Sequence, residues 1–177
     1  MTSVRLTVLF LLFLPATAIA QAVPAPQRSR AEIVAAARDV MQKARYCTFV
    51  TLGDDGHPQA RIVDPLGPDA NFTTWIATNP LTRKVDQVRR DARVTLLCFD
   101  AATSSYVTVL GKAAIVTDAA ERAQRWKDDW APFYARGASG NAFLLIRVTP
   151  IRLEIVSVER GMVGDPRTWL PRSVDFP

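Results

Sequence analysis

The feature that most constrains the fold is a series of strand-like segments joined by short turns. Six stretches are rich in β-branched and other apolar residues: 46–52, 57–66, 71–78, 92–99, 105–117 and 141–157. The first two flank the turn sequence Gly-Asp-Asp-Gly and are expected to form a hairpin. A parallel doubly wound sheet needs a crossover helix after each strand, and that alternation is missing. The pattern therefore favours a mainly-β antiparallel barrel or sandwich.

Two of these segments carry an irregularity. Gly111 lies inside the fifth segment and predicts a bulge or bend, since an interior glycine weakens a strand. Pro150 has no N–H group to donate to a neighbouring strand, so the last segment is expected to break near it.

The sequence also predicts three helices. The first begins after Ser29, because Ser29 and Glu32 have the spacing of a capping box. Its apolar residues fall on one face at helical spacing: Ile33, Ala37, Val40, Met41 and Ala44. The second covers about residues 80–90, with Asn79-Pro80 as N-cap and first helical position. The third runs from Asp118 to about residue 134, with a second capping box at Glu121.

The first twenty residues have the pattern of a secretory signal peptide. Arg5 precedes an apolar run over residues 6–14, and Ala18-Ile19-Ala20 resembles a cleavage site. A membrane anchor is disfavoured, because a spanning helix needs about 20 apolar residues and Pro15 interrupts the run. We expect cleavage before Gln21, a periplasmic or secreted product, and no membrane attachment of the mature chain.

The mature chain has the size of one ordinary domain. Residues 21–28 are expected to form a flexible lead-in, residues 29–160 the folded domain, and residues 161–177 a tail that packs on it. The formal charge of the whole chain is +5, but its basic residues are scattered and often adjoin acids. Nucleic-acid binding usually needs a clustered basic stripe, so we expect no nucleic-acid partner.

The sequence offers few candidates for catalysis by side chains or for metal binding. Cys47 and Cys98 either form one disulfide or serve as small buried hydrophobic residues, and the second interpretation is preferred. Two isolated cysteines and one histidine lack the ligand spacing of a zinc site. His57 follows the Gly-Asp-Asp-Gly turn and is interpreted as a solvated turn residue. We therefore expect no metal and assign no catalytic residue.

One stretch, Thr-Asn-Pro-Leu-Thr-Arg-Lys at residues 78–84, gathers hydrogen-bond donors at the start of the second helix. A helix N-terminus with Thr82, Arg83 and Lys84 beside it is suited to phosphate. Taken alone, the stretch is slightly better explained as a capped helix with a solvated basic face. Arg61 supports the interpretation as a phosphate site, because an arginine among apolar strand residues needs an anion or solvent.

With these residues in view, the chain resembles the pyridoxamine 5′-phosphate oxidase-like superfamily of FMN-binding split barrels, in its general-stress-protein branch. The resemblance covers about residues 30–157 and rests on four segments in order: TFVTLGDDGHPQARIV, TTWIATNPLTRKVDQVRRDARVTLLCFD, SYVTVLGKAAIVTD and LLIRVTPIRLEI. It implies a six-stranded antiparallel split β-barrel of Greek-key type with flanking α-helices. It also implies a homodimer with FMN bound in a groove between the subunits.

The resemblance further implies roles for individual residues. Arg61, Thr82, Arg83 and Lys84 would bind the FMN phosphate, while Ile62, Val63, Ala77 and Thr78 would line the edge of the isoalloxazine ring. Asp64-Pro65 departs from the family pattern, and the tryptophan-and-arginine substrate motif of the true oxidases is not evident. Trp169 in the C-terminal tail either covers a neighbouring site or belongs to a tail that packs on the barrel, and the second role is preferred.

The function expected from the sequence is that of an exported FMN-dependent oxidoreductase acting on a small molecule. In this class of protein the cofactor performs the redox chemistry and the protein supplies orientation and electrostatics. The alternatives are a dimeric envelope protein that binds FMN, haem or another small ligand without turnover, and a cofactor-free protein of the same fold.

Overall fold

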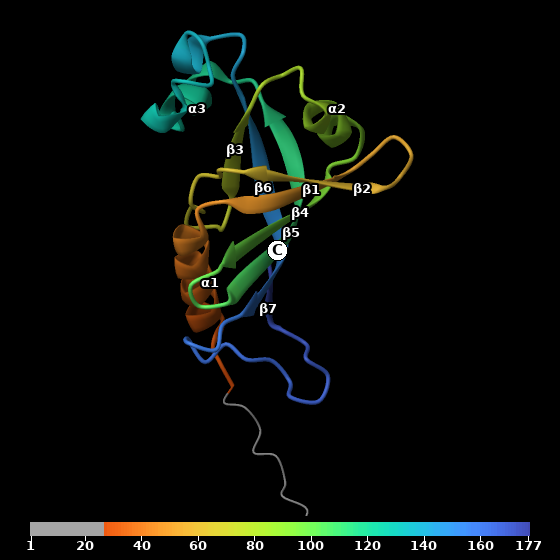
Figure 1. The fold of residues 1–177 in the computed structure, drawn as a ribbon, viewed down its shortest axis with the longest axis vertical. Coiled ribbons are helices and arrows are strands. Elements are labelled where there is room, and N and C mark those ends of the chain that lie inside the picture. Colours follow the sequence, from red (N-terminus) through yellow and green to blue (C-terminus); the bar gives the residue numbers. More distant parts are fainter. Residues whose placement is uncertain (1–26) are drawn as a thin grey trace, which may run out of the picture.

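The computed structural model describes residues 27–177, so the expected signal peptide and most of the lead-in lie outside the described residues. The described chain forms one antiparallel sheet with helices around it (Figure 1). The elements are α1 (Arg30–Ala44), β1 (Cys47–Leu52), β2 (Pro58–Val63), β3 (Thr74–Thr78), α2 (Arg83–Arg90), β4 (Arg93–Asp100), β5 (Ser105–Val116), α3 (Ala119–Gln124), η1 (Asp128–Trp130), η2 (Gly137–Ser139), β6 (Leu144–Val156) and β7 (Arg172–Asp175).

The strands follow the order β2-β1-β4-β5-β6-β3, and β7 pairs with the later part of β6. Every strand pairing is antiparallel, and β1 and β2 form the expected hairpin. An isolated bridge between Pro65 and Ile76 links the segment after β2 to β3, but the sheet is not closed. The prediction of a mainly-β split barrel with flanking helices is confirmed, with seven strands in place of the expected six.

Alternation along the strands produces the core. Inward-facing residues of β1 and β4, such as Phe49 and Leu96, are fully buried, and they meet the buried face of α1. That helix packs against β4, β5 and β7, while α2 packs against β1 and β5. The capping box of α1 forms as predicted, since Ser29 Oγ accepts from Glu32 N and the Glu32 carboxylate accepts from Ser29 N.

Gly111 marks the predicted bulge, because the register of β5 against β6 shifts between Leu110 and Gly111. A Cβ at Gly111 would lie 2.5 Å from Thr149 O, so only glycine fits this close approach of two strands. The predicted break at Pro150 is wrong. Pro150 lies opposite Gly111 at the bulge, where the regular ladder is already interrupted, so its missing N–H does not end the strand.

Strands β2 and β3 are shorter than predicted, because residues 64–73 form a structured loop between them. The Asp69 carboxylate accepts from the backbone N–H groups of Asn71 and Thr73, at 2.9 Å each. Phe72 adopts a left-handed backbone with φ of 65° while its ring is fully buried. Local side-chain hydrogen bonds and one buried ring thus compete with extension of the strands.

The second helix starts later than predicted. Asn79 does not act as its N-cap, because the Asn79 Oδ1 atom accepts from Leu81 N in a preceding turn, at 2.9 Å. Asn79 O also accepts from Thr82 N at 3.1 Å, and the helix begins at Arg83 with Thr82 as N-cap. Asparagine readily forms this kind of local turn, which displaces the helix by one turn of chain.

The third helix is much shorter than predicted and ends at Gln124. The Asp118 side chain caps Glu121 N, but the Glu121 carboxylate accepts from Trp75 Nε1 at 2.8 Å and does not complete a capping box. After Gln124 the chain forms two short 3₁₀ turns, η1 and η2. The aromatic residues of this segment, Trp126, Trp130, Tyr134 and Phe143, build a second hydrophobic cluster with Trp75, away from the barrel core.

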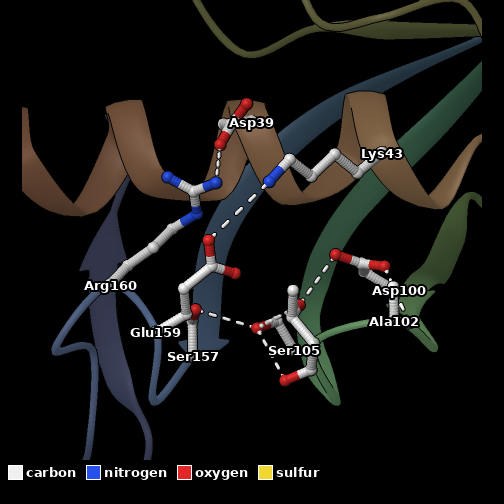
Figure 2. A network of polar contacts seen from close by, with 9 residues as sticks. Asp39, Lys43, Asp100, Ala102, Ser105, Ser157, Glu159 and Arg160 are labelled. Atoms are coloured by element: carbon white, nitrogen blue, oxygen red, sulfur yellow. Dashed lines mark hydrogen bonds and ion pairs between the residues drawn. The ribbon is translucent and has the colours of Figure 1, made fainter.

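A polar network fastens the end of β6 to α1 and to the start of β5 (Figure 2). The hydroxyl of Ser105 donates to that of Ser157 at 2.8 Å, and both side chains are buried. Arg160 forms an ion pair with Asp39 on α1. The chain then continues to β7, a strand that the sequence pattern did not reveal because it is only four residues long.

Cys47 on β1 and Cys98 on β4 form a disulfide, so the preferred interpretation of two unpaired cysteines is wrong. The register explains the pairing. The two residues lie directly opposite each other in the β1–β4 ladder, with their Cα atoms 4.2 Å apart. In the described part of the chain, no helix has the length and apolar character needed to span a membrane.

Candidate functional site

A groove of about 480 Å³ opens where the ends of β2 and β3 meet the start of α2 and the aromatic turns after α3. Its lining includes six of the eight residues predicted to bind the cofactor: Ile62, Val63, Ala77, Thr78, Thr82 and Lys84. The hairpin and the β3–α2 junction bring these residues together from two distant parts of the sequence.

Hydroxyl and amide groups form one end of this groove. Thr78 Oγ1 and Thr82 Oγ1 lie 3.0 Å apart, and the Thr82 hydroxyl donates to Asn79 O at 2.9 Å. No side chain caps α2, and the backbone N–H groups of Arg83 and Lys84 donate to no other described group. Free N–H groups at a helix start carry partial positive charge and attract anions.

Lys84 adds a full positive charge at the same end. Its side chain is partly buried and forms no ion pair or hydrogen bond with any described residue. Burial, followed by the charge of Arg61, lowers the pKa of the Lys84 ammonium below its ordinary value. A cation in this situation is stabilised by a bound anion, so this end of the groove favours an anionic group.

Arg61 lies behind the groove lining and is held by three acceptors. Its Nη1 atom donates to Phe49 O at 3.2 Å and to Thr51 Oγ1 at 2.6 Å, and its Nη2 atom donates to Gln87 Oε1 at 2.9 Å. Burial and then the nearby charge of Arg83 lower the pKa of Arg61. Arg61 is therefore close enough to Lys84 and Arg83 to act with them electrostatically.

The structure places the side chain of Arg83 elsewhere. It is exposed and lines a separate depression of about 330 Å³ between α2 and the β1–β2 hairpin, whose other lining residues include Gln59, Asp86, Gln87 and Arg90. Arg83 forms no ion pair with a described residue. Its backbone N–H points to the groove end of the helix, whereas its side chain does not line the groove.

The other end of the groove is aromatic, and sequence reasoning missed it. Tyr46, Trp130, Phe133 and Tyr134 line this end. The ring of Tyr134 packs edge-on against Phe143 with centroids 5.1 Å apart, and burial raises the pKa of the Tyr134 phenol. The dense aromatic spacing of the segment Trp-Lys-Asp-Asp-Trp-Ala-Pro-Phe-Tyr at residues 126–134 was a signal, which the prediction of a long third helix concealed.

Charged groups at the aromatic end are paired with each other. Lys127 Nζ lies 2.9 Å from Asp64 Oδ2, and Arg45 lies 3.6 Å from Asp129. Asp64 and Asp129 both line the groove, so neither carboxylate is free of a cationic partner. The unpaired charge of the groove is therefore at the Lys84 end, and the aromatic end is close to neutral.

Two residues singled out in the sequence lie outside the groove. His57 is exposed in the β1–β2 turn, and Trp169 is 86% exposed on the loop before β7. Among residues 27–177, no three histidine, cysteine or carboxylate side chains lie close enough to hold a metal ion.

The groove can thus hold a ligand with an anionic head and a flat apolar body. The hydroxyl pair, the free N–H groups and Lys84 suit a phosphate, which takes several charge-assisted hydrogen bonds. The apolar edge of Ile62, Val63 and Ala77 and the aromatic wall suit a planar ring system.

Residues 33–157, more than half of the chain, match the family model described as pyridoxamine 5′-phosphate oxidase. No curated protein shows significant sequence similarity to the chain. Among solved structures, a protein related to general stress protein 26 from Clostridium acetobutylicum is similar with a TM-score of 0.68 and 16% identity, over 81% of this chain and 94% of the other.

Two further structures show the same likeness. General stress protein 26 from Bacillus anthracis has a TM-score of 0.64 at 16% identity, over 82% of this chain and 97% of the other. A pyridoxamine 5′-phosphate oxidase-related, FMN-binding protein from Nostoc punctiforme has a TM-score of 0.54 at 14% identity, over 81% of this chain and 95% of the other. At these identities the likeness establishes a shared fold.

Proposed function

The chain belongs to the pyridoxamine 5′-phosphate oxidase family, and on that premise we propose that it binds FMN in the groove and uses it for oxidation–reduction. One observation carries the proposal. Lys84 is a partly buried cation without a described acidic partner, and it lies at one end of a groove whose other end is aromatic. This polarity matches FMN, which has a phosphate at one end and a planar ring system at the other.

The residues present fit the cofactor. Thr78, Thr82, Lys84 and the N–H groups at the start of α2 would hold the phosphate, with Arg61 contributing its charge from behind. Ile62, Val63 and Ala77 would line the ring edge. When bound, FMN supplies transfer of electrons or hydride, and the protein contributes binding, orientation and exclusion of water. The half-buried phenol of Tyr134 keeps its proton at neutral pH and can donate a hydrogen bond in the groove.

A matched pair of lysine variants tests the phosphate contact. Lys84→Met removes the proposed phosphate ligand, whereas Lys112→Met removes an exposed lysine on β5 outside the groove. Loss of one charge-assisted contact, about 1.5–3 kcal/mol, corresponds to a roughly 10–100-fold weaker Kd. We expect that loss for FMN with Lys84→Met, little change for riboflavin, and no change with Lys112→Met. Equal losses of affinity for FMN and riboflavin would mean that the phosphate of FMN binds elsewhere.

Binding without turnover is the second candidate function. It is supported by the ion pairs of Asp64 and Asp129, which leave neither carboxylate of the groove free to act as an acid or base. The two functions differ in flavin reactivity. If the protein is a redox enzyme, at least one small-molecule acceptor should reoxidise bound, chemically reduced FMN faster than it reoxidises free reduced FMN. If the protein only binds flavin, every acceptor should reoxidise bound reduced FMN more slowly than free reduced FMN.

We propose that the mature protein is exported, as its leader pattern suggests. The disulfide between Cys47 and Cys98 supports this, because such bonds persist mainly in oxidising compartments. Mass spectrometry of the protein from the periplasm or medium should give a chain starting at Gln21. A folded protein that is found in the cytoplasm with residues 1–20 still attached would contradict export.

We also propose that the protein forms a homodimer. The outer face of β1, β4, β5 and β6 carries a largely apolar groove of about 500 Å³, lined by residues that include Val50, Leu110 and Ile151. Leu110 is 38% exposed and Ile151 46% exposed, and burial of such a face favours association. Light scattering should give twice the chain mass, and Leu110→Asp should give monomers. A wild-type monomer at micromolar concentration would contradict dimerisation.

A further inference from the structure

A set of uncharged hydrogen-bonding groups surrounds the guanidinium of Arg61. Beyond the bonds of Arg61 described above, Thr51 Oγ1 lies within hydrogen-bond distance of Gln87 Oε1 and donates to it. Gln87 Nε2 in turn donates to Gln59 Oε1 at 2.8 Å. The oxygen of Gln87 therefore accepts from Thr51 and from Arg61, and its nitrogen is anchored on β2.

The groups that hold Arg61 are deeply buried. Thr51 is 1% exposed and Gln87 is 3% exposed, on β1 and α2 respectively. Burial of polar side chains is unfavourable unless each finds a partner, and here each does. Satisfied networks of this kind hold their members in one arrangement. Gln87 thus fixes the direction of the Arg61 side chain between the sheet and the helix.

The network holds Arg61 without neutralising it. All three acceptors, a backbone carbonyl, a hydroxyl and an amide, are uncharged, and no described carboxylate forms an ion pair with Arg61. A guanidinium has five N–H groups, and the described contacts use three of them. The Nε–H group and one Nη2–H group remain free for another acceptor, and Lys84 and Arg83 are the nearby charges.

We propose that Gln87 is a positioning residue that keeps Arg61 fixed and fully charged, and thereby makes the groove selective for phosphorylated over dephosphorylated flavin. The proposal rests on the proposed function, because the phosphate of FMN is the anion concerned. A glutamate at this position would have nearly the same shape and would still accept from Arg61. Its carboxylate, however, would pair with the guanidinium and cancel the charge that attracts phosphate.

Three variants test this role by calorimetric titration with FMN and riboflavin. Gln87→Glu is expected to weaken FMN binding at least tenfold, and Gln87→Met about fivefold, with riboflavin changed less than twofold. Gln42→Glu adds the same charge at an exposed position of α1 and should leave both affinities unchanged. A merely structural role of Gln87 would weaken both ligands together, and that result would overturn the proposal.

A second readout does not depend on flavin. The Nε–H signal of Arg61 in nitrogen-15 spectra should move when inorganic phosphate is added to the wild type, and should not move in Gln87→Glu. If the wild type binds neither flavin but shows this difference, the proposed function and the flavin selectivity both fail, and only the positioning of Arg61 for phosphate by Gln87 stands. If the Arg61 signal ignores phosphate in the wild type, or responds equally in both proteins, the role of Gln87 is wrong.

Discussion

Reduction of the disulfide between Cys47 and Cys98 is expected to cost the protein a large part of its stability. The two residues are 51 positions apart, and both are buried at 1% exposure or less. For a closed loop of this length, the chain-entropy relation gives about 14 cal/mol/K, or about 4 kcal/mol at 25 °C. Measured losses on removal of native disulfides run at about 2–5 kcal/mol, so we expect 2–4 kcal/mol. Total stabilities of about 5–15 kcal/mol make this a large effect.

The assay is urea unfolding of residues 21–177, with and without dithiothreitol, followed by far-ultraviolet circular dichroism. Reduction leaves the residues unchanged, so the shift in the free energy of unfolding isolates the bond itself. The double variant Cys47→Ala/Cys98→Ala should unfold at the same urea concentration with and without reductant. The reasoning is refuted if the wild type is equally indifferent to reductant, or if the native protein shows two free thiols after brief denaturation without reductant.

Three substitutions and one control substitution probe the rest of the structure by urea or thermal unfolding. Gly111→Ala forces a Cβ against Thr149 O and should lower the free energy of unfolding by about 2 kcal/mol. In the control Gly67→Ala the new Cβ meets nothing within 4 Å, so stability should change by less than about 0.5 kcal/mol. Equal effects of the two substitutions would contradict the close approach of β5 and β6 at Gly111. Ser29→Ala removes the cap of α1 and should cost about 1 kcal/mol, and no loss would mean that the cap contributes nothing. Lys84→Met removes a cation whose pKa is lowered by burial, so the ligand-free variant should melt about 1–3 °C higher at pH 7. The gain in melting temperature should fade as the pH rises from the lowered pKa of Lys84 in the folded protein towards 10.5, because the lysine then loses its proton in the folded and the unfolded state alike. A variant that melts at a lower temperature than the wild type at pH 7 would contradict this reasoning.

The sequence predicted the elements whose signals are local. The capping box at Ser29 and the bulge at Gly111 depend on neighbouring residues or on one missing side chain, and both appear as expected. The hairpin followed from two apolar segments around a turn sequence. The groove lining was predicted through Thr78, Thr82 and Lys84, because the β3–α2 junction sets their spacing directly.

What the sequence did not reveal depends on contacts between distant segments. Glu121 had the spacing of a capping box, but Trp75, 46 positions earlier, takes its carboxylate as a hydrogen-bond acceptor. The disulfide depends on the pairing of β1 with β4, which two isolated cysteines do not disclose. Likewise Gln87 reads as an ordinary residue of an exposed helix until the fold brings it to Thr51 and Arg61.

The central claim is that the groove binds FMN through its phosphate, and the ligand pair FMN and riboflavin tests it most directly. Both ligands are titrated calorimetrically into purified residues 21–177, with the visible spectrum recorded at each step. We predict that FMN binds with a shifted flavin spectrum and at least tenfold more tightly than riboflavin, which lacks the phosphate. A protein that binds neither flavin, or binds both with the same affinity, would contradict the claim.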